Sequence, residues 1–303
     1  MTSCGQGVQD TRARQRHDES ALSDVRFIRR RNPPGHVRVS GADGIIAIMA
    51  SHHPPTPDLP SRPVALVTGA ARRLGAAIAR HLHAHGYDLA LHYRGSADEM
   101  QALVDELAVI RPGSVLSLQA DLGEFDRLPE LVSQVIGRFG RLDALVNNAS
   151  SFMATPIGTA TPAQWDEVFA SNARAPFFLA QAAAPHLAVR GGAIVNMADI
   201  YGERPLREHP LYCMAKAALL MATQSLALEL APDVRVNAIA PGAILWPENG
   251  DNTAYKASLM GRIPLARTGS PEEIAETVRW LLQDATYTTG QVIRVDGGRT
   301  LEA

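Results

Sequence analysis

The chain has 303 residues, of which 46% are hydrophobic and 20% charged, and its formal net charge at pH 7 is −2. Such a composition is ordinary for a globular protein and leaves room for one large domain. The small net charge argues against a nucleic-acid partner. No stretch approaches the roughly 18 apolar residues of a membrane span, and two distant cysteines offer neither a disulfide framework nor metal-ligand spacing. We therefore expect a cytoplasmic protein with no nucleic-acid partner, no membrane and no metal.

The first 61 residues differ in composition from the remainder. They contain eight arginines, no lysine, two pairs of adjacent prolines and little hydrophobic periodicity. A segment of this kind buries too little apolar surface to offset the entropy of ordering. We predict that residues 1–61 form a disordered extension with no assigned function, and Met49 is an alternative start of the chain.

From Pro63 onward, short apolar segments alternate with longer segments rich in Ala and Leu. This alternation is typical of a parallel sheet with helices on both faces. It predicts strands at Val64–Thr68, Leu89–Tyr93, Val115–Asp121, Ala144–Asn147, Ala193–Met197, Arg235–Ala240 and Gln291–Val295. It predicts helices near Arg73–His85, Ala97–Val109, Arg127–Phe139, Pro162–Leu187, Tyr212–Leu230 and Pro271–Leu282. We expect residues 62–303 to form one Rossmann-type, doubly wound α/β domain with a seven-stranded parallel sheet.

A glycine-bearing turn joins the first predicted strand to the first predicted helix. It runs Thr68-Gly69-Ala70-Ala71-Arg72-Arg73-Leu74-Gly75. Such a turn brings backbone N–H groups and a helix N-terminus to a pyrophosphate. A turn that binds nothing is the alternative, but the position directly after the first strand of an α/β pattern favours a dinucleotide site.

The segment after the second predicted strand indicates which dinucleotide binds. An NAD site generally has an acidic residue here to bind the ribose hydroxyls. This chain has Tyr93, Arg94 and Ser96 instead, and its first carboxylate after the strand is Asp98. Because a cation and a hydroxyl suit a 2′-phosphate, we expect NADP or NADPH as the cofactor.

Two further strand ends supply polar groups. Asp121 and Leu122 follow the third predicted strand, where the carboxylate can accept a hydrogen bond from an adenine amine. The run Asn147-Asn148-Ala149-Ser150 follows the fourth. Sheets of this type bind ligands at the carboxyl ends of their strands, so both segments are candidates for the cofactor site.

Tyr212 and Lys216 are four residues apart, and Lys216 is one of only two lysines in a chain with 27 arginines. On a helix this spacing places both side chains on one face. An ammonium group beside a phenol stabilises the phenolate and lowers a pKa that begins near ~10. Tyr212 is then a candidate proton donor near neutral pH. Taken alone, the pair also fits a surface Tyr and a solvated Lys.

Together these segments resemble the short-chain dehydrogenase/reductase family over residues 63–303. The motifs that carry the resemblance are Thr68-Gly69 with Gly75, Asn147-Asn148-Ala149, Asn172, Tyr212 with Lys216, Pro241-Gly242 and Asp296-Gly297-Gly298. The resemblance implies that Tyr212 donates the proton, that Lys216 binds the nicotinamide ribose and lowers the pKa of Tyr212, and that Asn172 holds a water in a proton relay. It also implies a homotetramer. The expected cofactor contacts are Gly69, Arg73, Leu74, Gly75, Tyr93, Arg94, Ser96, Asp121, Leu122, Asn148, Ala149, Ser150, Tyr212, Lys216, Pro241 and Gly242.

Two departures from the common family pattern are shared with one subfamily, the pteridine reductases. Arg73 replaces the middle glycine of the turn, and Asp199 replaces the usual serine thirteen residues before the tyrosine. The resemblance implies that Phe152 stacks on a flat pterin, that Arg73 contacts the cofactor phosphates and the pterin, and that Ser150 hydrogen-bonds the ring. The expected substrate contacts are Arg73, Ser150, Phe152, Asp199, Tyr212 and Trp246, with a mobile substrate loop at about residues 245–262.

The chemistry of a pterin independently fits Asp199. Reduction of a ring C=N bond requires a proton at nitrogen as hydride reaches the adjacent carbon. A carboxyl whose pKa is raised by burial near Tyr212 can help to supply that proton. We therefore expect NADPH-dependent reduction of a pterin, dihydropterin or dihydrofolate. The alternatives are a short-chain reductase of another small carbonyl or imine and a non-catalytic NADPH-binding sensor.

Overall fold

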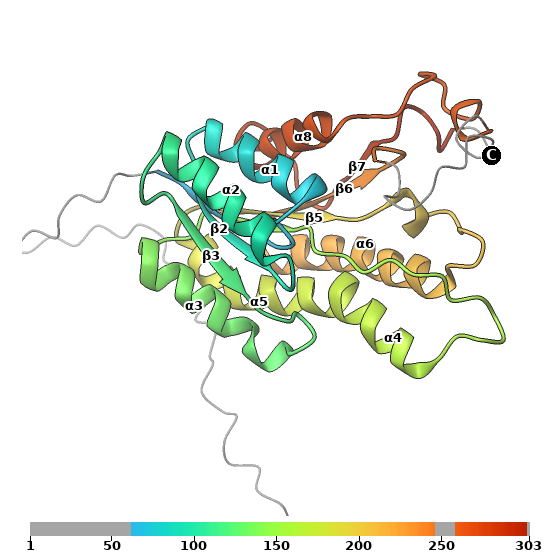
Figure 1. Ribbon diagram of the computed structural model, residues 1–303, viewed down its shortest axis with the longest axis horizontal. Coiled ribbons are helices and arrows are strands. Elements are labelled where there is room, and N and C mark those ends of the chain that lie inside the picture. Colours follow the sequence, from blue (N-terminus) through green and yellow to red (C-terminus); the bar gives the residue numbers. More distant parts are fainter. Residues whose placement is uncertain (1–61, 246–257, 302–303) are drawn as a thin grey trace, which may run out of the picture. The chain divides into compact units, whose positions relative to one another are not determined.

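The computed structural model describes residues 62–245 and 258–301, which form an α/β fold (Figure 1). Within these residues, seven parallel strands make one sheet in the order β3-β2-β1-β4-β5-β6-β7. The strands are β1 (Val64–Val67), β2 (Asp88–Tyr93), β3 (Val115–Gln119), β4 (Ala144–Asn147), β5 (Ala193–Met197), β6 (Arg235–Pro241) and β7 (Val292–Val295). The predicted doubly wound sheet is therefore confirmed, with strand ends that differ by one or two residues. The predicted disordered extension lies outside the described residues.

The central strands are apolar on both sides because both sides are covered. All residues of β1, β4 and β5 are buried. Strands of a parallel sheet that is covered on two faces show continuous apolar runs instead of an alternating pattern. The apolar runs from which the strands are predicted thus follow directly from this two-sided burial.

Helices cover the sheet in two layers (Figure 1). On one face lie α1 (Arg73–Ala84), α2 (Ala97–Ile110) and α8 (Pro271–Gln283), whose apolar residues share one buried cluster. On the other face lie α3 (Leu128–Phe139), α5 (Ala175–Ala188) and the later part of α6 (Pro210–Leu230), around a second cluster. The sheet separates two cores, and no strand side chain of the centre is left exposed.

The sheet changes direction between β1 and β4. From β1 the chain builds outward to β3, and then returns to place β4 on the other side of β1. At such a point the two loops that leave the carboxyl ends diverge and leave a crevice in which ligands bind. The glycine turn after β1 and the Asn148 segment after β4 lie at this place.

One predicted helix is interrupted in the structure. Instead of a continuous helix over Pro162–Leu187, the chain forms α4 (Pro162–Phe169), a π-helical turn (Ala170–Arg174) and α5. A π turn inserts one extra residue into the hydrogen-bond ladder and re-aims the side chains that follow. The turn contains Asn172, one of the predicted site residues.

Helix α6 is long and apolar enough, by length and composition alone, to cross a membrane. This corrects the expectation that no stretch approaches a membrane span. The helix carries the buried side chains of Tyr212, Lys216 and Thr223, and it packs against β6 and the π-helical turn. A core helix packed on several sides has the same apolar composition, which explains the match.

Candidate active site

Tyr212 and Asp199 form a hydrogen-bonded pair at the carboxyl end of β5. Tyr212 lies in the first turn of α6, and Asp199 follows β5 after one intervening residue. The Tyr212 hydroxyl donates to Asp199 Oδ2 at 2.7 Å. Asp199 Oδ1 accepts the backbone N–H of Tyr201 at 2.9 Å, which fixes the carboxyl in its turn. The two predicted proton donors therefore share one hydrogen bond.

Lys216 lies one helical turn after Tyr212, as the spacing predicts. Tyr212 is 5% exposed and Lys216 only 2%. Lys216 Nζ donates to the Met197 carbonyl at 2.8 Å and lies 5.6 Å from the centroid of the Tyr212 ring. Because both side chains are buried, the alternative of a solvated surface pair is wrong.

Burial shifts all three ionisable groups of this cluster toward their neutral forms. Burial raises the pKa of the Asp199 carboxyl, and the opposing hydrogen bonds from Tyr201 and Tyr212 and charges of Lys216 and Arg299 are smaller effects. Burial, and then the Asp199 carboxylate, raises the pKa of Tyr212 well above its ordinary value. Burial lowers the pKa of Lys216 to about 8.

These pKa shifts agree with one prediction from the sequence and contradict another. The raised pKa of Asp199 agrees with the prediction that this carboxyl retains a proton. The expectation that Lys216 lowers the pKa of Tyr212 is wrong in this structure, because Lys216 is bonded to the Met197 carbonyl while the phenol faces Asp199. Burial thus raises the pKa of both oxygen acids, and the site disfavours a phenolate at Tyr212.

Asn172 and Ser150 complete the cluster. Asn172 Nδ2 donates to the carbonyls of Ser151 at 2.8 Å and of Val168 at 2.9 Å, and its Oδ1 accepts from Ser150 Oγ at 2.7 Å. A hydrogen bond with Ser150 in turn has a minor lowering effect on the pKa of Tyr212. Asn172 therefore holds the Ser150 segment against the phenol, while its predicted role in binding a water stays a prediction.

The glycine turn packs directly on the end of β4. Gly69 has φ +62°, and a Cβ there would lie 2.9 Å from Ala149 Cα. A Cβ on Gly75 would lie 2.1 Å from the Gly69 carbonyl oxygen. Asn148 Nδ2 donates to the carbonyls of Thr68 at 2.8 Å and Gly69 at 3.0 Å. Asn148 and Ala149 thus form the wall of the turn, and the backbone approach requires glycine at both positions.

Helix α1 presents an open N-terminus to this turn. It begins at Arg73 with no side-chain cap and no acidic residue in its first turn, whereas α4 and α8 both have complete capping boxes. The N–H groups of an uncapped first turn bind anions. This arrangement fits the pyrophosphate of a dinucleotide.

Arg73 replaces the usual glycine without a change of backbone conformation. Its φ is +53°, in the left-handed region that glycine normally occupies. Its exposed side chain starts at the N-terminus of α1, and the side chain of Leu74 packs on the core beneath it. Arg73 therefore lies at the glycine turn, and its contact with the cofactor phosphates stays a prediction.

The segments expected to bind the adenosine half lie at neighbouring strand ends. Tyr93 ends β2, and the exposed Arg94 and partly buried Ser96 follow it. Beyond β3, Asp121 is exposed and its Oδ1 accepts the N–H of Gly123 at 2.8 Å, while Leu122 is buried. A cation and a hydroxyl at the end of β2, with no carboxylate between them, fit a 2′-phosphate.

Pro241 and Gly242 close the other side of the site. Gly242 donates its N–H to the Val295 carbonyl at 3.0 Å, and a Cβ on Gly242 would lie 2.7 Å from Asp296 Cα. The Pro-Gly motif after β6 and the Asp-Gly-Gly motif after β7 are thus packed together. Their distance in sequence gives no hint of this contact.

Phe152 lies beside the proton donors. The residue is 57% exposed. Its ring centroid lies 4.8 Å from that of Tyr212 in an edge-to-face arrangement and 4.5 Å from that of His209, on which it stacks at 15°. The alternative of a Phe that merely packs beneath a loop does not fit this exposure. Trp246 and most of the predicted substrate loop lie outside the described residues.

His92 is a site residue that the sequence analysis did not assign. It is buried at the end of β2, where its Nδ1 accepts the Gly69 N–H at 3.2 Å and its Nε2 lies 3.1 Å from the Ala120 carbonyl. These partners require the neutral Nε2–H tautomer, and burial lowers the pKa of His92 accordingly. In the sequence, the only sign of this role is a histidine within the otherwise apolar run of β2.

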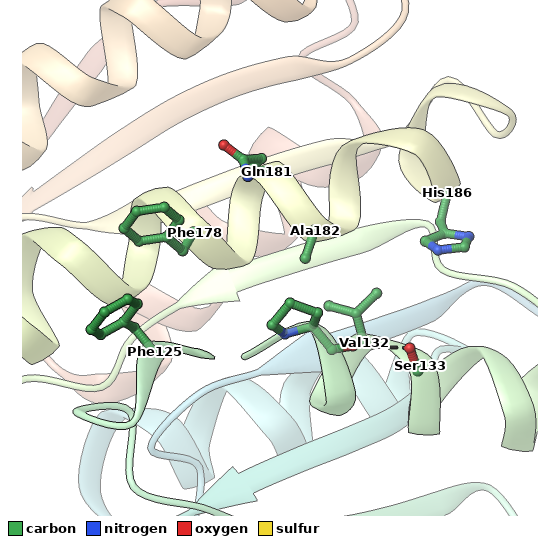
Figure 2. A pocket seen from close by; sticks show the side chains of 8 residues that line it. Phe125, Val132, Ser133, Phe178, Gln181, Ala182 and His186 are labelled. Carbon is green, nitrogen blue, oxygen red and sulfur yellow. Dashed lines mark hydrogen bonds between the residues drawn. The ribbon is translucent and has the colours of Figure 1, made fainter. Parts of the chain in front are cut away.

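Two other features lie away from the cluster. His81, His85 and Glu276 could together hold a metal ion, but Arg279 already donates to both oxygens of Glu276. A hollow between α3 and α5 is lined by Phe125, Pro129, Val132, Ser133, Phe178, Gln181, Ala182 and His186 (Figure 2). Neither feature contains a predicted site residue.

Comparison with known proteins identifies the family. Residues 69–300 match the family described as enoyl-(acyl carrier protein) reductase. Pteridine reductase 1 of Leishmania tarentolae is 39% identical over 283 residues, covering 80% of this chain and 98% of that protein. A ketoacyl reductase of the granaticin polyketide synthase of Streptomyces violaceoruber is also 39% identical, over 251 residues, 80% of this chain and 98% of that protein.

A third relative is the 3-oxoacyl-[acyl-carrier-protein] reductase FabG of Staphylococcus aureus. It is 37% identical over 238 residues, 77% of this chain and 96% of that protein. Relatives that reduce pterins and relatives that reduce ketoacyl groups are thus about equally similar, so the matches settle the family and the NADP(H) cofactor but not the substrate. The chain belongs to the short-chain dehydrogenase/reductase family and is an NADP(H)-dependent oxidoreductase.

Proposed function

We propose that this reductase acts on the ring of a pterin, a dihydropterin or dihydrofolate. The observation that carries the proposal is the 2.7 Å hydrogen bond from the Tyr212 hydroxyl to Asp199 Oδ2. The family pattern has a serine at this position, whose hydroxyl polarises a carbonyl. A carboxyl with a raised pKa holds a proton that it can release to a ring nitrogen.

The two proton donors of the cluster match the proton that reduction of a C=N bond requires. When bound, NADPH would supply the hydride that reduces the ring carbon and would be oxidised to NADP⁺. The electron pair of the C=N π bond then takes a proton at the adjacent nitrogen. Burial raises the pKa of both Tyr212 and Asp199, which favours the protonated, proton-donating form of each at this place. As the family resemblance implies, Lys216 would bind the nicotinamide ribose; in the structure its buried Nζ donates to the Met197 carbonyl and not to the phenol.

Phe152 supports a flat substrate. Phe152 is 57% exposed and lies directly beside Tyr212, so its aromatic ring, which stacks on His209 with one face, places an apolar group next to the proton donors. Aromatic stacking stabilises a planar heterocycle by about 0.5–1.5 kcal/mol beyond the burial of its area. An aliphatic ketone gains little from such a plane.

A small carbonyl compound is the second candidate. The observation in its favour is the identity of 37–39% with ketoacyl reductases. Asp199 in place of the serine, and the exposed Phe152, disfavour it. A non-catalytic NADPH-binding sensor is disfavoured because it has no use for a buried cluster of Asp199, Tyr212 and Lys216.

We also propose a homotetramer in which α5 and α6 contact neighbouring subunits. Several large apolar side chains of these helices are exposed: Phe177, Met214, Met221 and Leu228. On α6, Met214, Met221 and Leu228 recur every seven residues, close to two helical turns, and exposed apolar side chains aligned in this way fit a protein contact.

The Asp199→Ser variant tests the pterin proposal. Wild type is expected to oxidise NADPH with dihydrobiopterin or dihydrofolate and not with an acetoacetyl thioester or a ketone panel. Loss of a positioned proton donor costs about 10²- to 10⁴-fold, so pterin turnover by the variant should fall by at least about 100-fold while the Kd for NADPH stays unchanged. The assay is NADPH absorbance, with binding followed by fluorescence.

The Glu203→Gln variant is the matched control, since it removes a carboxylate from the same turn that pairs with Arg294 instead of Tyr212. Its turnover should equal that of wild type. Unchanged pterin turnover in Asp199→Ser, or turnover of the thioester alone by wild type, contradicts the proposal.

A further inference from the structure

The turn that carries Asp199 is bonded to the last residues of the described chain. We define the Asp199 turn as residues 199–204 and the C-terminal segment as residues 294–301. Three contacts join them: Arg299 Nη2 donates to the Tyr201 hydroxyl at 2.7 Å, Arg204 Nη2 donates to the Thr300 carbonyl at 2.5 Å, and Arg294 pairs with Glu203 at 2.7 Å.

Only one of these contacts continues to the proton donors. The Arg299 guanidinium lies 5.3 Å from the centroid of the Tyr201 ring, in addition to its hydrogen bond with the hydroxyl. The backbone N–H of Tyr201 donates to Asp199 Oδ1 at 2.9 Å. The other oxygen, Oδ2, accepts from Tyr212 at 2.7 Å. Arg299 therefore holds the residue whose main chain orients the carboxyl.

We propose that Arg299 is a positioning residue for proton transfer, which fixes Asp199 through Tyr201 and places a permanent positive charge behind the carboxyl. This inference rests on the proposed function in one respect only, the role of Asp199 as a proton donor. Arg299 itself touches neither Tyr212 nor Asp199 through any hydrogen bond recorded for the described residues.

The charged and titratable groups around Asp199 come from three places. Tyr212 and Lys216 face it from α6, Tyr201 from its own turn, and Arg299 from the C-terminal segment. Lys216 and Arg299 are the two cations, and both lower the pKa of Asp199 against the larger effect of burial. Because Lys216 loses its own charge near pH 8, Arg299 is the cation that remains above that pH.

Removal of Arg299 is expected to shift the pKa of Asp199 upward while it lowers the maximal rate. Loss of Arg299 removes a favourable charge from the carboxylate, so the pKa of Asp199 rises further. A protonated Asp199 then persists to higher pH, and the alkaline limb of the activity profile moves upward. At the same time the carboxyl is less well oriented, so the maximal rate falls. A role in folding alone lowers the rate or the yield but does not move the profile.

The test compares Arg299→Met and Arg299→Lys with Arg294→Gln. Carboxyl ¹³C NMR of protein labelled at Asp Cγ, with the Asp199 signal assigned by its absence in Asp199→Asn, gives the pKa without any substrate. Arg299→Met should raise this pKa by about half a pH unit or more, Arg299→Lys should retain most of the wild-type value, and Arg294→Gln should be unchanged. Arg294 is the matched control because it removes the same charge from the same segment and pairs with the same turn.

If Arg299→Met folds poorly, the Tyr201→Phe variant tests the same contact. It removes the hydroxyl that accepts from Arg299 and leaves the ring and the N–H in place, so the pKa should shift in the same direction by a smaller amount. The pH dependence of kcat should follow the NMR values.

An Asp199 signal that titrates identically in Arg299→Met and wild type, or one that shifts equally in Arg294→Gln, overturns the inference. If wild type reduces no pterin, the proposed function fails but the NMR comparison still decides whether Arg299 acts on Asp199.

Discussion

Tyr212, Asp199 and Lys216 form one buried cluster of ionisable groups, and burial favours the neutral form of each. In a catalyst that must deliver a proton, raised pKa values are useful in Tyr212 and Asp199 because they favour the protonated donors. The lowered pKa of Lys216 means that its charged form destabilises the fold. The protonated ammonium in an apolar site loses solvation that a single carbonyl hydrogen bond only partly replaces. Burial of Lys216 therefore lowers the stability of the fold wherever the lysine is charged.

The stability cost of Lys216 gives a pH-dependent prediction. The pKa of Lys216 is about 8 in the folded protein, against an ordinary lysine value of 10.5 that applies to the unfolded chain. Between these pH values the unfolded chain therefore binds more protons than the folded one. The cost of burying Lys216 is therefore absent above the pKa of the unfolded state. It grows as pH falls and is fully present below the pKa of the folded state. A difference of this size is worth about 3 kcal/mol.

Denaturant titration of wild type and Lys216→Met at several pH values measures the effect. The free energy of unfolding of wild type should rise between pH 7 and pH 10 by up to about 3 kcal/mol more than that of the variant. All other titrating groups are common to both proteins and cancel in the difference. Parallel curves would show that Lys216 has an ordinary pKa.

At the scale of elements, the ends of the helices divide into two kinds. α4 and α8 begin with capping boxes, Thr161 with Gln164 and Ser270 with Glu273. α1, α2, α3 and α6 begin with no side-chain cap, and of these α1 directly follows the glycine turn. A helix end that is satisfied by its own side chains serves stability, and an open end leaves its N–H groups for a ligand.

Ser270→Ala tests this division. Removal of the cap from α8 should lower the free energy of unfolding by about 1 kcal/mol and leave the Kd for NADPH unchanged. Ser133→Ala on α3 is the matched control, because the Ser133 hydroxyl donates to the Pro129 carbonyl within a helix and caps nothing. Thermal and chemical denaturation compare the two. A larger loss in the control than in Ser270→Ala contradicts the capping argument.

At the scale of the whole molecule, the two apolar cores lie inside the fold, but α5 and α6 also carry apolar side chains outward. Met221 is 60% and Leu228 79% exposed on α6. A helix that packs on the sheet with one face and exposes apolar side chains on another is typical of a subunit contact.

Met221→Glu places a charge in the proposed contact and should convert the tetramer into smaller species, as seen by sedimentation or mass photometry. Val109→Glu is the control, since Val109 is equally apolar and is 85% exposed on α2, on the other face of the sheet. Its assembly should match that of wild type. A monomeric wild type would remove the basis of the proposal.

The sequence determined the fold class, the seven strands and the family, because each depends on patterns that lie close together in the chain. Continuous apolar runs predict strands covered on both faces, and four-residue spacing places Tyr212 and Lys216 on one helix face. The glycines at 69 and 75 mark the turn since only glycine allows so close a backbone approach.

The tertiary structure alone decided features that depend on distant contacts. The π-helical turn around Asn172 accompanies hydrogen bonds to the segment after β4. His92 has its role because β2 lies between β1 and β3, so its ring reaches Gly69 on one side and Ala120 on the other. Arg299 has its role because the C-terminal segment lies against the Asp199 turn. The direction of the Tyr212 pKa was decided in the same way, because burial and then Asp199 raise it, whereas the sequence displays only the proximity of Lys216 along the helix.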